Sequence, residues 1–385
     1  KFYWIRFLLI VMKMFCVALL SMTCCFAGES LTREQADELV KKEWSATVKS
    51  LAQDRAAEMK ERSITLNGKT MRFLEKTFGE APAGGRPLVI SLHGGGGAPA
   101  QVNDGQWQNQ IRLYQPEGSL YIAPRAPTDT WNLWHEGHID ALFDRLIANC
   151  IAVHKINPDR VYVMGYSAGG DGVYQIGPRM ADRWAAASMM AGHPNESQPT
   201  SLRNLPFALQ VGGQDAMFKR NEVTQQWAEK LDVLEKASPG DYVHFFKSYP
   251  ECGHWMNGQD AVAVPWMLKF TRKCWPKKIS WLQDDIISPR FYWLSVNPAE
   301  AKAQQVIEAS CEGQMIRLTT DAVKSITLRL SDQLLDLDKE ITVEWNGKKV
   351  FSGKVERSVD AVKKSIAERQ DPSTIATALL EVKLP

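Results

Sequence analysis

The chain has 385 residues, 46 Lys and Arg against 44 Asp and Glu, a formal net charge of +2 and 44% hydrophobic residues. This composition is that of an ordinary globular protein, which excludes general disorder and a fibrous chain. The near-zero net charge excludes the basic surface that nucleic-acid binding requires. The length predicts two domains, or one large domain with an appendage.

The N-terminal segment, residues 1–27, has the pattern of a secretory signal peptide. It carries three positive charges and no acidic residue, contains an apolar stretch over 14–22, and ends in Ala27. We therefore expect an exported protein, periplasmic or extracellular, with no stable membrane insertion after cleavage. The alternative is an uncleaved membrane anchor, because the stretch from Phe7 to Phe26 contains Lys13 as its single charge.

Four cysteines remain once residues 1–27 are removed, and they are Cys150, Cys252, Cys274 and Cys311. An even number in an exported protein permits two disulfides, in any of three pairings. Cys252 and Cys274 are the nearest pair in sequence, which weakly favours a bond between them. Four free thiols are the equally weighted alternative.

The next segment, 28–68, reads as a helical arm. Thr32 and Gln35 have the spacing of a capping box. Apolar residues then recur at helical intervals, which predicts one long helix over 30–62. Its other face is charged, so we expect the arm to pack on a neighbouring element.

Residues 69–275 read as an α/β domain. Short continuous apolar runs are expected to be strands, at 70–78, 87–92, 119–123, 160–164, 184–191, 206–211 and 242–249. Amphipathic stretches between them are expected to be helices, at 138–155, 168–182, 222–236 and 258–272. Strands that alternate with helices predict a mainly parallel sheet covered on both faces.

Residues 280–385 read as a β-rich accessory domain. Strands are expected within 289–296, 304–319 and 325–356, then a helix over 359–370 and a last strand over 375–384. Asn346-Gly347 lies between two of the strand patterns and is a strong signal for a tight hairpin turn. The segment is large enough for a core of its own.

The strongest chemical motif is Gly165-Tyr166-Ser167-Ala168-Gly169, which follows a predicted strand and opens a predicted helix. This context is that of a nucleophile elbow, in which a strained turn presents a serine hydroxyl.

A second motif, residues 93–97 (HGGGG), follows the strand 87–92 and offers free backbone N–H groups. A phosphate-binding loop does not fit, since no Gly-Lys-Ser/Thr follows. His93 itself is expected to orient the loop.

Two further loops complete an active-site pattern. Asp215 ends the motif GGQD after strand 206–211, and His254 lies in CGHW after strand 242–249. The chain order Ser167, Asp215, His254 is the order of α/β-hydrolases. His254 would take the proton of Ser167, and Asp215 would orient the imidazole. His193 also follows a strand but precedes Asp215, and Asp171 is expected to have a packing or capping role.

These four motifs, in this order and on these elements, resemble the α/β-hydrolase esterases grouped with poly(3-hydroxybutyrate) depolymerases, near feruloyl and acetylxylan esterases. The resemblance covers roughly residues 69–272. It implies an α/β-hydrolase fold and a triad of Ser167, Asp215 and His254. It also implies Gly94 or Gly95 with Ala168 as donors to the oxyanion. No family is recognised for 280–385.

The expected function is therefore metal-independent and cofactor-independent hydrolysis of an ester substrate, on carbohydrate-linked acyl groups or a polyester. Trp131, Trp134 and Trp255 lie near the predicted site and could stack on such a substrate, although ordinary packing is as reasonable. Two alternatives are a serine peptidase of the same fold and a non-catalytic binding protein built on a hydrolase scaffold. The sequence leaves the natural ester and the oligomeric state open.

Overall fold

The computed structural model describes residues 30–384, so the predicted signal peptide, 1–27, and its alternative as an anchor lie outside the described residues. The chain from Leu31 onward forms one compact unit. Within residues 30–384, no helix combines the length and the apolar character needed to cross a bilayer.

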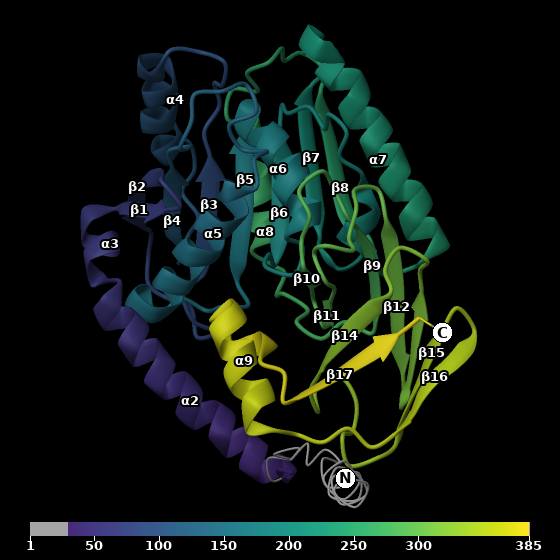
Figure 1. Cartoon of the computed structure of the whole chain (residues 1–385). Coiled ribbons are helices and arrows are strands. Elements are labelled where there is room, and N and C mark those ends of the chain that lie inside the picture. The colour runs from purple at the N-terminus through teal and green to yellow at the C-terminus, as the bar shows by residue number, and fades with distance from the viewer. Residues whose placement is uncertain (1–29, 385) are drawn as a thin grey trace, which may run out of the picture. The chain divides into compact units, whose positions relative to one another are not determined.

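The centre of this unit is an eight-stranded sheet with the order β1-β2-β4-β3-β5-β6-β7-β8 (Figure 1). From β4 to β8 neighbouring strands are parallel, while β2 is antiparallel to β4 and β1 to β2. The strands are β1 (Ser63–Leu66), β2 (Lys69–Thr77), β3 (Leu88–Leu92), β4 (Leu120–Pro124), β5 (Val161–Tyr166), β6 (Ala186–Met190), β7 (Phe207–Gly212) and β8 (His244–Tyr249). The predicted strands are confirmed, and β1 is an addition from the segment expected to be helical.

Helices cover both faces of this sheet. Residues of α5, α6 and α7 share one buried cluster with Leu88 and Ile90, whereas α4 and α8 share another with Val89. Alternate residues of β3 therefore point into opposite cores, as period two requires. The helices are α4 (Ala100–Leu113), α5 (His138–Asn149), α6 (Ala168–Arg179), α7 (Arg220–Ala237) and α8 (Ala263–Met267). The sheet and its helices confirm the predicted α/β class.

Two helix predictions differ from the structure. The arm helix divides at Arg55 (φ −113°, ψ 5°) into α2 (Arg33–Asp54) and α3 (Ala56–Glu61). The Arg55 guanidinium donates to the side chain of Asn149, so a tertiary contact accompanies the break. The helix expected over 258–272 is a 3₁₀ turn (Gln259–Val262) followed by the short α8. The capping box of Thr32 and Gln35 is formed as predicted.

The remainder of the chain builds two smaller sheets and one helix. One sheet has the order β10-β11-β14-β17, the other β16-β15-β13-β12-β9. Their elements are β9 (Lys278–Leu282), β10 (Arg290–Phe291), β11 (Leu294–Ser295), β12 (Val306–Glu312), β13 (Met315–Thr319), β14 (Ser325–Leu330), β15 (Ile341–Trp345), β16 (Lys348–Gly353), α9 (Val359–Arg369) and β17 (Ala378–Lys383). Asn346 and Gly347 both have positive φ (49° and 77°), as the predicted hairpin turn requires.

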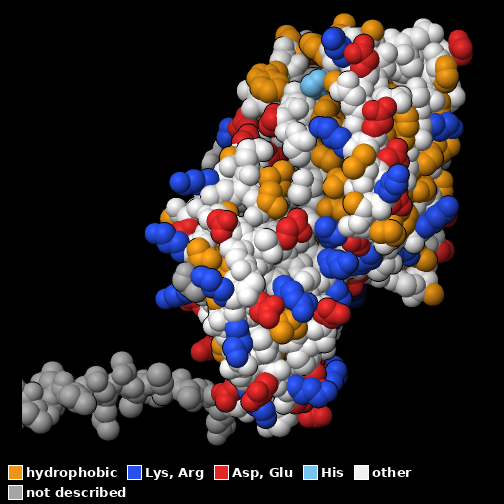
Figure 2. All heavy atoms as spheres, turned by 90° about the vertical axis from the view of Figure 1, so that its right-hand side faces the viewer, with side chains coloured by type: hydrophobic (Ala, Val, Ile, Leu, Met, Phe, Trp, Pro, Cys, Tyr) orange, Lys and Arg blue, Asp and Glu red, His pale blue; other side chains and the backbone are white. Residues whose placement is uncertain are grey.

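The β-rich part and the central sheet share one continuous cluster of buried side chains, which includes Trp281, Trp293 and Trp345. Helix α2 packs Leu39, Val40 and Trp44 against α9. Figure 2 shows one surface of the molecule, on which hydrophobic side chains gather in the upper part and charges of both signs are interspersed below. The division into domains at 275–280 stays a prediction, since the buried cluster runs across it.

The four described cysteines are unpaired. Cys252 lies near the side chain of Gln259, and Cys274 lies beside Asp159. The weakly favoured bond between Cys252 and Cys274 is therefore not formed, and the alternative of free thiols holds for this structure. Cys150, Cys252 and Cys311 are buried, and burial raises the pKa of Cys274 to about 12.

Candidate active site

Ser167 lies on the tight turn between β5 and α6. Its backbone has φ 59° and ψ −124°, a region that non-glycine residues rarely adopt and that costs about 1–3 kcal/mol. A Cβ on Gly165 would lie 2.2 Å from the carbonyl oxygen of Gly169, and a Cβ on Gly169 would lie 2.1 Å from that of Leu92. The glycines on either side of the serine are thus required by close packing of the turn against β3.

Ser167, His254 and Asp215 form one hydrogen-bonded chain. His254 Nε2 is 2.9 Å from Ser167 Oγ, and His254 Nδ1 is 2.7 Å from Asp215 Oδ2. The Asp215 side chain is 1% exposed and that of His254 is 43% exposed. The three residues come from the ends of β5, β7 and β8, so the parallel sheet brings them to one edge. A buried carboxylate can hold one imidazole tautomer, while the other nitrogen faces the serine.

Two contacts fix the loop that carries His254. The Tyr166 hydroxyl donates to the His254 carbonyl oxygen (2.7 Å) and accepts from the Met256 N–H (2.9 Å). The Gln214 N–H donates to the Cys252 carbonyl oxygen at 2.9 Å, which ties the loop of Asp215 to that of His254. The role of Tyr166 could not be predicted from the sequence, because any residue type can precede the serine in this motif.

The glycine loop 93–97 packs directly against the serine. A Cβ on Gly94 would lie 3.1 Å from Ser167 Cβ, so the backbone at Gly94 approaches the elbow closely. The N–H groups of Gly94, Gly95 and Ala168 donate to no other residue between 30 and 384. The Gly96 N–H is different, because it donates to Asn103 Oδ1 at 2.8 Å. Free N–H groups beside a serine oxygen are the arrangement that an oxyanion needs.

His93 holds the start of this loop and does not face the serine. Its Nδ1 lies 2.6 Å from the Gly94 carbonyl oxygen, and its Nε2 accepts from the Ala126 N–H at 3.1 Å. Burial lowers the pKa of His93 to about 4, so the ring is neutral at neutral pH. A neutral ring donates from Nδ1 and accepts at Nε2, which is the orienting role that the sequence predicts.

The three tryptophans predicted near the site have different environments. Trp131 and Trp255 are 64% and 49% exposed. Trp131 lies against Gly96 and Gly97, and the Trp255 ring is 5.3 Å from that of Tyr166. Trp134 is fully buried and donates to the His93 carbonyl oxygen. Its position does not fit a substrate contact, because adjoining helix α6 covers it.

Exposed apolar side chains also follow Asp215 directly, which the sequence analysis missed. Met217 and Phe218 are both 67% exposed, and Phe218 has a positive φ of 54°. The Arg220 guanidinium lies 4.9 Å from the Phe218 ring and 3.9 Å from Asp215 Oδ1. With Trp131 and Trp255, these residues place apolar surface on three loops, those after β4, β7 and β8.

Asp171 and His193 lie behind the serine. The Asp171 N–H donates to the Ser167 carbonyl oxygen (2.9 Å), and the Asp171 carboxylate accepts from the His193 N–H (2.6 Å). Burial raises the pKa of Asp171 to about 6. His193 is held by this contact and by the Asn195 N–H, so neither residue joins the chain of Ser167, His254 and Asp215.

One group of acidic side chains was not apparent in the sequence. Glu196, Asp284 and Asp285 present oxygen atoms within 4.8 Å of one another. They come from the loop after β6 and the loop after β9, so the fold alone brings them together. Such groups of exposed acids are common without a metal ion.

Comparisons with known proteins point to esterases. No known family profile matches the chain. The chain is 28% identical over 154 residues to the putative esterase NocK of Nocardia uniformis subsp. tsuyamanensis, a match to 36% of this chain and 44% of that protein. It therefore spans less than half the length of this relative.

Among solved structures, the chain is similar to a thermostable esterase (TM-score 0.40, 15% identity, 55% of this chain and 62% of that one). It is also similar to LpqC, a poly(3-hydroxybutyrate) depolymerase from Bordetella parapertussis (TM-score 0.40, 17% identity, 58% of this chain and 96% of that one). The match to the putative esterase supports the expected resemblance to esterases.

Proposed function

We propose that the protein is an exported serine hydrolase that cleaves carboxylic esters, acting on carbohydrate-linked acyl groups or a polyester. The observation that carries the proposal is the continuous chain from Asp215 through His254 to Ser167, with contacts of 2.7 and 2.9 Å. The partial similarity to a putative esterase supports the same chemistry. The roles of the residues follow from the atoms that face each other.

In the first half-reaction, Ser167 Oγ attacks the ester carbonyl carbon while His254 Nε2 takes the hydroxyl proton. Asp215 stabilises the imidazolium through its contact with Nδ1. The oxyanion accepts from the N–H of Ala168 and from that of Gly94 or Gly95, which have no other partner between 30 and 384. The C–O bond of the ester then breaks, and the alcohol leaves with the proton from His254.

In the second half-reaction, water attacks the acyl carbon and gives a proton to His254. The bond from Ser167 Oγ to the acyl carbon breaks, Oγ recovers its proton, and the carboxylic acid leaves. The 43% exposure of the His254 side chain supports this step, because water must reach the nitrogen that faces the serine.

The surroundings of the serine support an acyl or polymer substrate with apolar surface. Trp131, Met217, Phe218 and Trp255 lie on the loops after β4, β7 and β8 and are each about half exposed or more. Flat aromatic faces of this kind stack on sugar rings or on aromatic acids, and methionine adapts to irregular apolar surfaces.

The test is hydrolysis of p-nitrophenyl esters of increasing acyl length, methyl ferulate and acetylated xylan. Wild type, Ser167→Ala and the exposed control Ser45→Ala on α2 are compared at equal concentration of folded protein. We expect Ser45→Ala to match wild type and Ser167→Ala to lose roughly 10⁵-fold or more in kcat. Turnover that survives in Ser167→Ala would exclude this nucleophile.

The same assay separates the alternatives. Cleavage of peptide p-nitroanilides without cleavage of any ester would identify a peptidase, and cleavage of neither would favour a binding protein. Export is tested separately by mass spectrometry of the protein recovered outside the cytoplasm. A new N-terminus at Gly28 is expected, and retention of residues 1–27 in the membrane fraction would identify an anchor.

A further inference from the structure

One cavity in the described part of the chain lies away from Ser167. It has a volume of about 750 Å³ and is lined by α5, the end of α6, the segment 286–297, β14 and α9. Ser167 precedes the first residue of α6, and the cavity begins at Arg179, its last residue. A helix of that length spans about 18 Å, so the cavity is a second site at the opposite end of α6. Its volume is within the range of small-molecule sites.

Most charged groups around this cavity are paired. Arg179 binds Asp140 at 2.6 Å, and Arg369 binds Asp182 at 2.8 Å. The other two pairs near the cavity are Arg183 with Asp144 and Arg329 with Glu368. Buried ions are tolerated when such pairing compensates them. Among the arginines that line the cavity, one has no such ion pair between residues 30 and 384.

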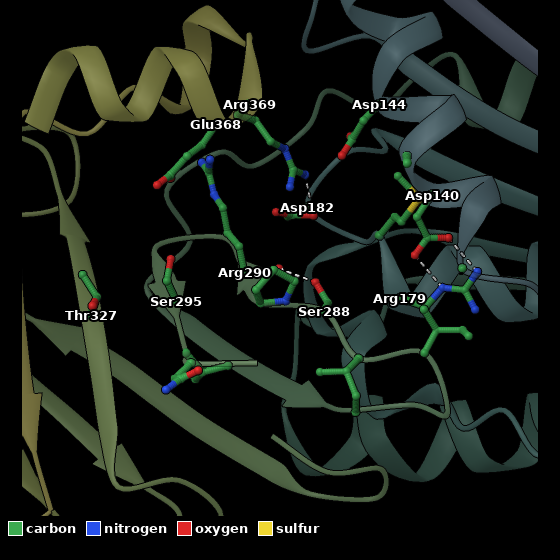
Figure 3. A pocket seen from close by; sticks show the side chains of 18 of the residues that line it. Asp140, Asp144, Arg179, Asp182, Ser288, Arg290, Ser295, Thr327, Glu368 and Arg369 are labelled. Atoms are coloured by element: carbon green, nitrogen blue, oxygen red, sulfur yellow. Dashed lines mark hydrogen bonds and ion pairs between the residues drawn. The ribbon is translucent and has the colours of Figure 1, made fainter. Parts of the chain in front are cut away.

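That residue is Arg290, on β10. Its Nε and Nη1 are buried and have no hydrogen-bond partner in the part of the chain between 30 and 384. Its Nη2 donates to the Thr374 carbonyl oxygen at 3.4 Å, and no carboxylate between 30 and 384 pairs with it. Figure 3 shows the side chain projecting from its strand toward α9, between Glu368 and Arg369.

The surroundings make this lone cation unfavourable without a partner. Burial, together with the nearby guanidinium groups of Arg369 and Arg329, lowers the pKa of Arg290 well below its ordinary value. A buried guanidinium with unused N–H groups is stabilised when an anion accepts from it. An anion that accepted from Nε and Nη1 would give both of these N–H groups a partner.

The rest of the cavity wall combines hydroxyl groups with apolar side chains. Ser295 and Thr327 lie on directly paired positions of β11 and β14 and face the cavity (Figure 3). Ile286, Ile287 and Val296 provide apolar surface. The hydroxyl groups suit the oxygens of a ligand, and the apolar side chains suit its carbon skeleton. The volume also exceeds what an inorganic anion would fill.

We infer that this cavity binds a small organic monocarboxylate, with Arg290 receiving the carboxylate and Ser295 and Thr327 contacting the body of the ligand. The site goes beyond the proposed ester hydrolysis and does not depend on it. A single carboxylate matches this site, because Arg290 is the one arginine of the wall without an ion pair among residues 30–384.

Isothermal titration calorimetry and thermal unfolding of the whole protein test this inference. The probes are benzoate and glucuronate, each with its uncharged amide, and inorganic phosphate. We expect saturable binding of at least one carboxylate, no binding of its amide, and at least a tenfold weaker affinity in Arg290→Met. The control Arg317→Met, on the exposed face of β13, should bind like wild type.

A second variant keeps the charge and removes a hydroxyl group. Thr327→Val should weaken binding about threefold to tenfold while Arg290 remains in place. Absence of carboxylate binding to wild type would overturn the inference, as would equal affinity in Arg290→Met. Binding of phosphate alone would overturn the assignment to an organic acid, and equal binding of the amide would remove the role of the charge.

Discussion

The polar groups at the two ends of helix α6 differ in their bonding and in their exposure to solvent. At the N-terminal end, Ser167, His254 and Asp215 form one short chain on loops that end strands, and His254 remains 43% exposed. At the C-terminal end, Arg179 joins a set of buried ion pairs between segments far apart in sequence. In the proposed function, the first end exchanges a proton with a substrate. The second end connects distant segments through ion pairs whose arginine side chains are nearly fully buried.

From this difference we expect substitutions at one end of α6 to affect mainly activity, and substitutions at the other end to affect mainly stability. A change at the N-terminal end should lower turnover and leave unfolding almost unchanged. A change in the ion pairs should lower the free energy of unfolding and leave the turnover of each folded molecule almost unchanged.

The largest effect is expected for Asp215→Asn. Asparagine keeps the shape of the side chain but favours the wrong imidazole tautomer, so kcat should fall about 10⁴-fold. The melting temperature should change little. The control is Asp37→Asn, an exposed change on α2 that should alter neither quantity. A fall of less than tenfold in Asp215→Asn would argue against the assigned role.

The next effect is expected for Asp371→Asn. The Asp371 carboxylate is fully buried and binds both Arg272 (2.7 Å) and Arg183 (3.0 Å). Its loss leaves two buried guanidinium groups without full compensation, which should cost about 3–5 kcal/mol of unfolding free energy. Urea unfolding measures this cost, and kcat per folded molecule should stay near wild type. Unchanged stability would show that water or other acids compensate the arginines.

The same difference between the two ends of α6 explains which residues could be predicted from the sequence. The serine, aspartate and histidine each follow an apolar strand within a few residues, so parallel strands must bring them to one edge. Asp371 and Arg272 are 99 residues apart, and no local pattern links them. Arg290 resembles any other arginine in sequence, because its lack of a partner is a property of the packed structure.

The same distinction applies to smaller features. The break at Arg55 coincides with a contact to Asn149, 94 residues away in sequence, and the burial of Trp134 depends on how α6 packs over it. Neither depends on neighbouring residues in sequence. The turn at Asn346-Gly347 and the cap at Thr32 were predictable, because backbone geometry alone requires those residues.

A third prediction concerns pH. The pKa of Asp171 is raised to about 6 in the folded protein by burial, compared with about 3.8 in the unfolded chain. The folded state therefore binds more protons in this range, and stability should fall as pH rises from about 4 to about 6, by at most about 3 kcal/mol. Asp171→Asn should remove this contribution. The measurement is the difference in unfolding free energy between variant and wild type at pH values across this range. A constant difference would contradict the raised pKa.

The smallest effect is expected for Tyr166→Phe. This variant tests how the loop of His254 is held at the N-terminal end of α6. The Tyr166 hydroxyl is the common partner of the His254 carbonyl oxygen and the Met256 N–H. Its removal leaves both groups unpaired, which should cost about 1–3 kcal/mol and let His254 move relative to Ser167. We expect kcat to fall about tenfold with KM nearly unchanged, because the histidine acts in the chemical step.

Tyr162→Phe is the matched control on the same strand. The Tyr162 hydroxyl donates to the Phe270 carbonyl oxygen at 2.7 Å, at the end of β5 away from Ser167. This variant should lose a similar amount of stability and keep its kcat. If both variants lost kcat equally, general loosening of the strand would be the cause. If only Tyr166→Phe does, the geometry of the site depends on one hydroxyl group that positions the histidine loop.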